Sequence, residues 1–375
     1  MGLTALQIHG EGLGTASFAY KTGDYRGATT AARFADPREE LAALRASCGV
    51  YDLGFRAKIS LTGGDRVRWL NGMVTNNIRD LGVGHGVYAF LLNPQGHILG
   101  DLYAYNRGES IMVDTDRSQL EKILATFEHY IIMDDVEVTN LSERLTALGV
   151  AGRKSRDVLR AAGMEFPELQ PLHFHTVQCD CDCGCVMCTI VRSEETQTES
   201  YEVWLAPIHV RPLWDALLKA GAAPVGSEAV ELQRIARGIP LYGADIRERD
   251  LPQETEQMRA LNFNKGCYVG QEIVERIRSR GAVHRKFAGF LAQGPAQIVP
   301  GAKILAGEKE VGEITSAALL PFAEGEKTVA LGYIRREAGV PGREVAIGAV
   351  KASVIQLPVE GLALQESRSL EHQRA

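Results

Sequence analysis

The chain has 375 residues, more than one ordinary compact core accommodates, so we expect two or three domains. Hydrophobic residues make up 45% of the chain and charged residues 23%, a balance that excludes an intrinsically disordered protein. The formal net charge is -6, and the lysines and arginines are spread along the chain, so the sequence argues against a nucleic-acid partner.

The N-terminal residues give no sign of export or organelle import. They lack a basic region followed by an apolar stretch, and they carry Glu11 and Asp24, whereas transit peptides avoid acidic residues. Elsewhere no window approaches the ~20 apolar residues that a helix needs to span a bilayer. We therefore expect a cytoplasmic protein without a membrane partner.

The first predicted elements alternate between helix and strand. Pro37 follows Asp36, and apolar side chains then recur at helical spacing, which predicts an N-capped helix over residues 37–52. Residues 57–61 alternate in polarity as a strand does, and a glycine-rich turn leads from them into a second helix over residues 66–70.

A β-hairpin is the next predicted element. Two apolar runs, residues 87–92 and 98–105, flank the reverse-turn sequence NPQG at 93–96. Residues 110–114 predict a third strand, and a helix follows over residues 117–130. Strands and helices mix without regular alternation, which favours an α+β fold over a doubly wound α/β fold.

The C-terminal part of the chain differs in its pattern. From Arg285 onward, short strand candidates follow one another with turns but no helices between them, which predicts a small β-barrel or sandwich. The candidates are residues 287–291, 303–306, 311–317, 329–334 and 350–357. We place a domain boundary near residue 283, so that residues 1–283 form two interleaved α+β lobes and residues 284–375 a β-barrel domain.

Five of the seven cysteines crowd into residues 179–188, namely Cys179, Cys181, Cys183, Cys185 and Cys188. Alternate positions of a strand share one face, but thiolates ~6.6 Å apart are too far from one another for a single tetrahedral zinc unless the chain bends. A labile metal or redox site is one interpretation. A loop of variable composition is favoured, because a second CxxC pair is missing. We therefore assign no metal ligand.

The segment KGCYVGQE at residues 265–272 concentrates a cation, a thiol, a phenol, an amide and a carboxylate, with Gly266 and Gly270 between them. Glycine lets the backbone approach a ligand closely. Lys265 lies two residues from Cys267, and a nearby cation favours the nucleophilic thiolate. Cys267 is therefore a candidate reactive thiol, the alternative being a small buried residue in a loop before a helix.

This segment resembles the KGCYxGQE signature of the YgfZ family of folate-binding proteins, relatives of the glycine cleavage T-protein, and it matches every fixed position. The resemblance extends from about Leu41 to Pro358, through GVYDL at 49–53, LNGMVTN at 70–76, LNPQG at 92–96, RIARGIP at 234–240 and ALGY at 330–333. It implies a three-lobed T-protein-like fold with a C-terminal β-barrel. It also implies a folate site in a central channel, for tetrahydrofolate or a one-carbon derivative.

The same resemblance implies a set of site residues. Glu202 falls where a T-protein glutamate holds the pterin, and a carboxylate can accept hydrogen bonds from two adjacent pterin N–H groups. Asp101 falls where the T-protein carries a paired-aspartate element, with Gly100 in place of the first aspartate, and could orient or protonate a reacting nitrogen. The candidate catalytic residues are Cys267, Lys265 and Asp101. The candidate folate contacts are Glu202, Tyr88, Asn93, Arg234, Tyr268, Gln271 and Glu272.

Three of these candidate site residues also have a simpler interpretation. Glu202 could be a solvated residue at a strand edge, Asp101 a polar residue after the hairpin turn, and Tyr88 a core residue. Val230 is a departure from the T-protein, which has an arginine near this position, and it removes one polar contact.

Three functions compete at this point. The resemblance favours a folate-dependent accessory protein for iron–sulfur cluster assembly or repair, whose partners are iron–sulfur client or assembly proteins. The alternative is a folate-dependent one-carbon (aminomethyl) transferase of the T-protein type, and the third is a structural protein that kept the fold and lost its ligand. Cys267 favours the first over the second, because the T-protein pattern does not require a thiol there. Glu202 and Asp101 argue against the third.

Overall fold

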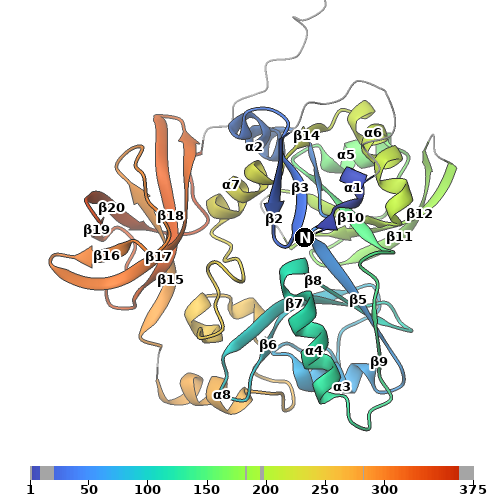
Figure 1. Cartoon of the computed structure of the whole chain (residues 1–375), viewed down its shortest axis with the longest axis horizontal. Helices are drawn as coiled ribbons and strands as arrows, with labels where there is room; N and C mark the ends of the chain where they lie inside the picture. The colour runs from blue at the N-terminus through green and yellow to red at the C-terminus, as the bar shows by residue number, and fades with distance from the viewer. Residues whose placement is uncertain (1, 9–20, 182–183, 195–197, 282, 363–375) are drawn as a thin grey trace, which may run out of the picture.

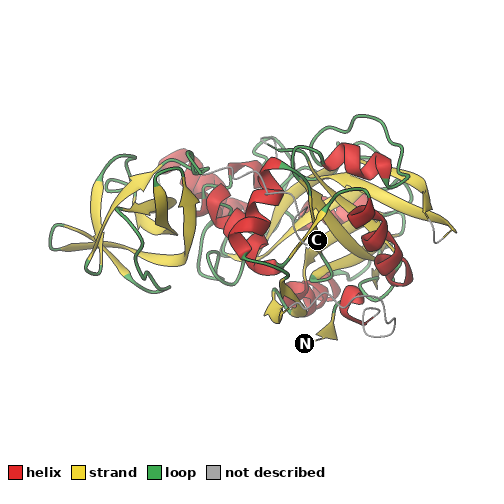
Figure 2. Ribbon diagram, turned by 90° about the horizontal axis from the view of Figure 1, so that it is seen from above, coloured by secondary structure: helices red, strands yellow, loops and turns green. Residues whose placement is uncertain are grey.

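The computed structural model describes residues 2–8, 21–181, 184–194, 198–281 and 283–362, which form three main bodies (Figure 1). Two are built on β-sheets that lie near each other, and the third is a closed β-barrel at one end of the molecule (Figure 2). This is a mixed α and β fold with a six-stranded C-terminal barrel, as the sequence predicted. Among the described helices, none is long and apolar enough to cross a membrane.

The first sheet has the strand order β6-β7-β8-β5-β9, and all its pairs are antiparallel. Its strands are β5 (Arg56–Thr62), β6 (Gly86–Leu92), β7 (Ile98–Asn106), β8 (Ile111–Asp116) and β9 (Glu137–Asn140). Helices α3 (Arg66–Met73) and α4 (Leu120–Tyr130), the latter after a short 3-10 turn at Arg117–Gln119, pack on one face. Leu70, Ile123 and Phe127 bury this face against alternate strand residues such as Ile59 and Val113, which leaves the other face for polar side chains.

The second sheet has the order β11-β12-β13-β10-β4-β14. Its strands are β4 (Gly49–Asp52), β10 (Thr146–Ala151), β11 (Phe174–Cys181), β12 (Gly184–Arg192), β13 (Ser200–Leu205) and β14 (Ala223–Val225), and only the β14–β4 pair is parallel. Helices α5 (Ser155–Ala161) and α6 (Val210–Lys219), the latter after a 3-10 turn at Pro207–His209, cover one face through Leu159, Leu213 and Trp214. The opposite face of β13 is therefore free to present Glu202.

A small N-terminal sheet of β1 (Gly2–Leu3), β3 (Ala28–Arg33) and β2 (Lys21–Tyr25) lies beside the second sheet, with the short helix α1 (Ala5–Ile8). Helix α2 (Pro37–Ala46) follows it. Helix α7 (Ser227–Arg237) packs on α2, β3 and β4 and also on the barrel, so it joins the second sheet to the barrel near the centre of the molecule (Figure 1).

The barrel closes in the order β15-β18-β17-β16-β19-β20. Its strands are β15 (Arg285–Ala292), β16 (Lys303–Ala306), β17 (Lys309–Phe322), β18 (Gly325–Arg335), β19 (Glu344–Ile347) and β20 (Val350–Ile355). The connection from α7 to the barrel contains two 3-10 turns, Pro252–Thr255 and Met258–Ala260, and helix α8 (Gln271–Arg280). An apolar cluster on the outer wall of the barrel includes Leu41, Ile235, Phe287 and Leu331, and it joins the barrel to α2 and α7.

Most of the predicted elements are confirmed, and two differ, the helix over residues 37–52 and the loop over the cysteine cluster. The predicted helix over residues 37–52 begins at Pro37, capped by the Asp36 side chain, but it ends at Ala46, and β4 follows. The strand β19 was not predicted. The loop predicted over the cysteine cluster is wrong for its described part: β11 and β12 form an antiparallel hairpin. Cys179 and Cys188 are buried on it in the apolar core.

The metal interpretation of the cysteine cluster can be examined only in part. Cys183 and the side chains of Cys181 and Cys185 lie outside the described residues. Among the side chains that the structure describes, no group of three or more His, Cys, Asp or Glu is placed to hold a metal ion.

Candidate functional site

A cavity of about 660 Å³ lies where the two sheets, α7, the connection after it and the barrel meet. Basic side chains outnumber acidic ones in its lining. The charged lining residues are Arg26, Arg56, Glu194, Glu202, Arg234, Arg237, Glu256, Arg259 and Lys286. Apolar and aromatic side chains, among them Phe55, Tyr103, Tyr105 and Val230, complete the wall. A volume of this size and this mixture of surfaces are typical of a small-molecule site.

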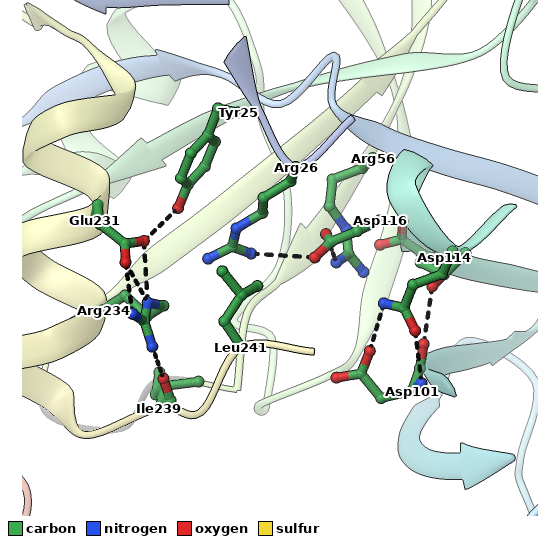
Figure 3. A network of polar contacts seen from close by, with 12 residues as sticks. Tyr25, Arg26, Arg56, Asp101, Asp114, Asp116, Glu231, Arg234, Ile239 and Leu241 are labelled. Atoms are coloured by element: carbon green, nitrogen blue, oxygen red, sulfur yellow. Dashed lines mark hydrogen bonds and ion pairs between the residues drawn. The ribbon is translucent and has the colours of Figure 1, made fainter. Parts of the chain in front are cut away.

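A buried ion network covers the polar face of the first sheet (Figure 3). Arg56 on β5 donates to Asp114 at 3.2 Å and to Asp116 at 2.6 Å, both on the paired strand β8. Lys58, two residues after Arg56 and therefore on the same face, donates to Asp114 at 2.8 Å. One oxygen of Asp114, Oδ2, is buried without a hydrogen-bond partner among the described atoms.

Glu202 enters the cavity from β13 and meets this network. Its Oε2 accepts a hydrogen bond from Trp204 Nε1 at 2.8 Å, and the Lys58 ammonium lies 4.7 Å from the centre of the Trp204 ring. Burial raises the pKa of Glu202, with a further contribution from the nearby Asp114 carboxylate, while Lys58 and Arg56 act in the opposite direction. The carboxyl group is thus held firmly at the cavity wall and is poorly hydrated.

Asp101 is fixed by two neighbours, Tyr88 on β6 and Gln119 in the 3-10 turn before α4. Tyr88 Oη donates to its Oδ2 at 2.7 Å, Gln119 Nε2 donates to its Oδ1 at 2.7 Å, and its backbone N–H donates to Gln119 at 2.9 Å. Burial raises the pKa of Asp101, and Asp116 raises it further. Arg259, which lines the cavity, lies over the Tyr88 ring at 4.5 Å, so the Tyr88–Asp101 pair lies directly behind the cavity wall.

Arg234 lines the cavity from α7, but its guanidinium also has a structural role. It donates to Glu231 in the preceding turn, to Asp245 at 2.5 Å and to Ser316 of the barrel at 2.9 Å. Asp245 in turn accepts hydrogen bonds from Thr315 and Ser316. Arg234 therefore joins α7 to the barrel at the edge of the cavity.

The KGCYVGQE segment packs elsewhere, against α3 and the turn of the β6–β7 hairpin. The Lys265 ammonium donates to three backbone oxygens, those of Asn71 at 2.5 Å, Val74 at 2.6 Å and Asn76 at 2.7 Å. Tyr268 is buried, whereas Cys267 is exposed. The backbone of Gly270 lies so close to the carbonyl of Asn93 that a Cβ there would be 2.6 Å from it.

The structure thus divides the predicted site residues into two groups. Glu202 and Arg234 line the cavity, and Tyr88 and Asp101 form a pair behind its wall. The other predicted residues are not among the described residues that line this cavity: Asn93, Lys265, Cys267, Tyr268, Gln271 and Glu272. Their roles remain predictions.

Most charged residues of the cavity and of its ion network were not predicted from the sequence. Among them are Arg26, Arg56, Asp114 and Asp116. A usable signal was present for three of these four. Arg56 directly precedes one predicted strand, Asp114 ends another and Asp116 lies two residues beyond it, so the spacing of two places both aspartates on one face of the strand. Arg26 had no such signal.

Comparisons with known proteins agree with this architecture. The GCVT N-terminal domain model matches residues 15–265, and the glycine cleavage T-protein C-terminal barrel domain model matches residues 285–359. The aminomethyltransferase of Rubrobacter xylanophilus is 29% identical over 340 residues, which cover 89% of each chain. That of Bacillus cytotoxicus is 26% identical over 356 residues, covering 92% of this chain and 95% of the relative.

Two further comparisons extend the picture. A putative chloroplast transferase of Arabidopsis thaliana is 26% identical over 300 residues, which cover 80% of this chain and 68% of the relative. The crystal structure of the glycine cleavage system aminomethyltransferase T from Bartonella henselae superposes with a TM-score of 0.83 at 24% identity, covering 97% of this chain and 99% of that one, which shows the same fold. The narrower YgfZ resemblance remains a prediction. Because the GCVT N-terminal model alone matches more than half of the chain, the chain belongs to the glycine cleavage T-protein family.

Proposed function

We propose that this chain binds a reduced folate in the central cavity and acts as a folate-dependent one-carbon transferase of the aminomethyltransferase type. The observation that carries the proposal is the carboxyl group of Glu202, which is buried at the cavity wall with one oxygen held by Trp204. A pterin presents adjacent N–H donors, and a carboxylate accepts two of them in a bidentate pair. The names of the relatives support the same reaction class.

The cavity lining fits a folate in two further respects. Arg26, which lines the cavity, has a buried Nε without a hydrogen-bond partner in the described part of the chain, an arrangement that favours a polar ligand. The excess of basic side chains in the lining favours a ligand that carries carboxylates, as the glutamyl end of a folate does.

Tetrahydrofolate, when bound, supplies nitrogen atoms that accept a one-carbon unit. Glu202 would hold and orient the pterin, while Arg56 and Lys58 lower the pKa of the neighbouring Asp114 carboxyl group and keep it ionised. Asp101 would hold a proton close to the reacting group. Its raised pKa suits that role, because general acids work best when their pKa lies near the operating pH.

The test is calorimetric titration with tetrahydrofolate of the wild type and of Glu202→Gln, which keeps the shape and removes the charge. We expect the affinity to fall by at least about tenfold, because one partner of a buried charge-assisted pair is lost. Glu228→Gln, on the exposed side of α7, is the matched control and should bind as the wild type does. Unchanged affinity in Glu202→Gln would remove Glu202 from the site, and a wild type that binds no folate would overturn the proposal.

A second candidate is a folate-dependent accessory role in iron–sulfur cluster assembly or repair, with iron–sulfur client or assembly proteins as partners. The observation that favours it is the exposed thiol of Cys267 within the complete KGCYVGQE segment. Of the other described cysteines, Cys48, Cys179 and Cys188 are buried, and burial raises the pKa of Cys48 and of Cys188 to about 12. The relatives are named for aminomethyl transfer, so this role ranks second.

Two measurements separate the two candidates. Alkylation at neutral pH, followed by mass spectrometry, should modify Cys267 before Cys48, Cys179 or Cys188, because the thiolate must be accessible. Cys267→Ser should then fail to restore iron–sulfur enzyme activity in a deletion strain while still binding tetrahydrofolate. Full restoration by Cys267→Ser would eliminate the second candidate and leave the first intact.

A further inference from the structure

Arg26 occupies the tip of the β2–β3 hairpin in a backbone conformation that is costly for an arginine. Its φ is 49° and that of Gly27 is 95°, and Tyr25 pairs with Ala28 across the turn. Two-residue hairpin turns with positive φ at both positions favour asparagine, aspartate and glycine. Such strain persists only where the surrounding structure fixes it, and it is frequent at ligand sites.

The hairpin tip is anchored on both sides. Tyr25 Oη donates to Glu231 on α7 at 3.0 Å, and the Tyr25 ring packs edge-on against Phe55 at 4.9 Å between ring centres. The Arg26 guanidinium lies 4.8 Å from the Tyr25 ring centre and 5.4 Å from that of Phe55. The two aromatic rings therefore hold the arginine in place at the cavity wall.

The charge of Arg26 is only partly compensated. Its side chain is 16% exposed, and its nearest carboxylate oxygen is Asp116 Oδ2 at 3.6 Å, while Arg56 holds the other oxygen of Asp116 at 2.6 Å. Arg26 Nε is buried without a partner among the described atoms. A buried guanidinium with so little pairing is costly, so a ligand anion at this position would stabilise it.

Arg26 also lies at a defined position along the cavity. The ion network runs from Asp114, which is close to Glu202, through Arg56 and Asp116 to Arg26, which Figure 3 shows between Asp116 and the Glu231–Arg234 pair of α7. On this side α7 contributes the apolar Val230 to the cavity lining together with Arg234 and Arg237, and the Arg234 guanidinium is already bound to Glu231, Asp245 and Ser316.

We propose, on the basis of the folate site proposed above, that Arg26 binds a carboxylate of the glutamyl end of the folate. With the pterin at Glu202, the opposite end of the ligand extends toward α7, and its carboxylates match the forked donors of a guanidinium. The N-terminal hairpin thus contributes a residue that distinguishes folates by their glutamyl group.

The experiment compares tetrahydrofolate with tetrahydropteroate, which lacks the glutamyl group, by calorimetry on the full-length chain. Arg26→Asn should bind tetrahydrofolate at least about tenfold more weakly than the wild type and tetrahydropteroate equally well. Its Tm should equal or exceed that of the wild type, because asparagine tolerates positive φ and no unpaired guanidinium is buried. The affinity of Arg26→Lys for tetrahydrofolate should lie between those of the wild type and Arg26→Asn. The control Arg33→Asn, which replaces an exposed arginine on β3, should bind both ligands as the wild type does.

Three results would overturn the assignment. The first is an affinity of Arg26→Asn for tetrahydrofolate equal to that of the wild type. The second is an equal loss of affinity for both ligands in Arg26→Asn together with a lower Tm. The third is an equal affinity of the wild type for both ligands. A wild type that binds neither ligand instead refutes the folate site itself, and the role of Arg26 is refuted with it.

Discussion

Two influences on the ionisation of Glu202 oppose each other, its burial and its proposed contact with the ligand. Burial raises its pKa, yet the proposed pterin contact requires the carboxylate. Lys58 and Arg56 favour the carboxylate from one side, and the N–H donors of a bound ligand would favour it from the other. Ligand binding and folding should therefore depend on pH in opposite ways.

We expect tetrahydrofolate affinity to fall as the pH is lowered through the raised pKa, at a pH above the ~4.3 of an ordinary glutamate. Without ligand, the folded state binds the proton more tightly than the unfolded chain, so this group's contribution to stability decreases as the pH rises between its ordinary and its raised pKa. Calorimetry and thermal unfolding across this range measure both trends. In Glu202→Gln both contributions should disappear, and unchanged pH profiles in that variant would contradict the assignment.

The sequence pattern predicted a catalytic role for Lys265, whereas in the fold its side chain makes contacts that stabilise the structure. Its ammonium has three donors, and three backbone oxygens around the end of α3 accept them. Burial, with the Arg79 guanidinium nearby, lowers the pKa of Lys265 to about 7, whereas the three carbonyls favour the ammonium. The side chain thus ties the segment before α8 to the first sheet.

Lys265→Met should therefore destabilise the protein by about 3 kcal/mol, because buried carbonyls lose their partner. We expect a Tm lower by several degrees in thermal unfolding and an unchanged affinity of the folded protein for tetrahydrofolate. Arg276→Met, an exposed basic residue on α8, serves as the control. A variant with the wild-type Tm and weakened folate binding would instead support the sequence-based prediction that Lys265 contacts the ligand.

Two predicted residues that lie at the cavity or directly behind its wall, Glu202 and Asp101, have chemistry that stands out locally. Glu202 follows a serine and a tyrosine in an apolar strand, and Asp101 interrupts the returning strand of the predicted hairpin. Arg26 could not be found in this way, because its role depends on a turn conformation and on contacts with Phe55 and α7 that are distant in sequence.

At the scale of elements, α7 links α2, β3 and β4 to the barrel strands β17 and β18. Asp245, just after it, accepts hydrogen bonds from Arg234 of α7, from Thr315 and Ser316 of β17, and from the backbone of Leu241. The Arg234–Asp245 pair is almost fully buried, with side chains 4% and 0% exposed. This carboxylate therefore fixes the barrel against the helix that borders the cavity.

Asp245→Asn should cost about 3 kcal/mol, because the buried Arg234 charge loses one of its two carboxylate partners and keeps only Glu231. Chemical denaturation measures the loss. The control is Asp215→Asn, which removes a half-exposed ion pair with Arg211 on α6 and should cost less than about 0.5 kcal/mol. If both variants shift the midpoint equally, Asp245 does not hold the barrel in place.

The elements that differed from prediction have physical explanations. Helix α2 ends early because Gly49–Asp52 gains more from pairing with β10 and β14 than from extending a helix. The cysteine-rich hairpin is a strand pair because Val177, Cys179, Val186 and Cys188 are buried beneath α5 and α6. In both cases distant partners decide the local structure, and a single segment of sequence does not reveal them.

At the scale of the molecule, the barrel has two apolar contacts of different kinds. One cluster, around Phe290, Ile314 and Val354, lies inside the closed strands and belongs to the barrel alone. The other joins Phe287 and Leu331 of the barrel wall to Leu41 and Ile235 of α2 and α7. The barrel therefore has its own core and is also docked.

This arrangement predicts the outcome of limited proteolysis. The first cuts should fall between α8, which ends at Arg280, and β15, which begins at Arg285, or in the cysteine-rich stretch, because proteases cut most readily at domain boundaries and loop tips. After a cut near residue 283 the two fragments should still elute together in size-exclusion chromatography, because the docked cluster is apolar and buried. In Asp245→Asn they should separate more readily, since that variant weakens the polar part of the same contact. Early cleavage within residues 88–105 would contradict the β6–β7 hairpin, and fragments that separate at once in the wild type would show that the barrel is held mainly by the chain connection.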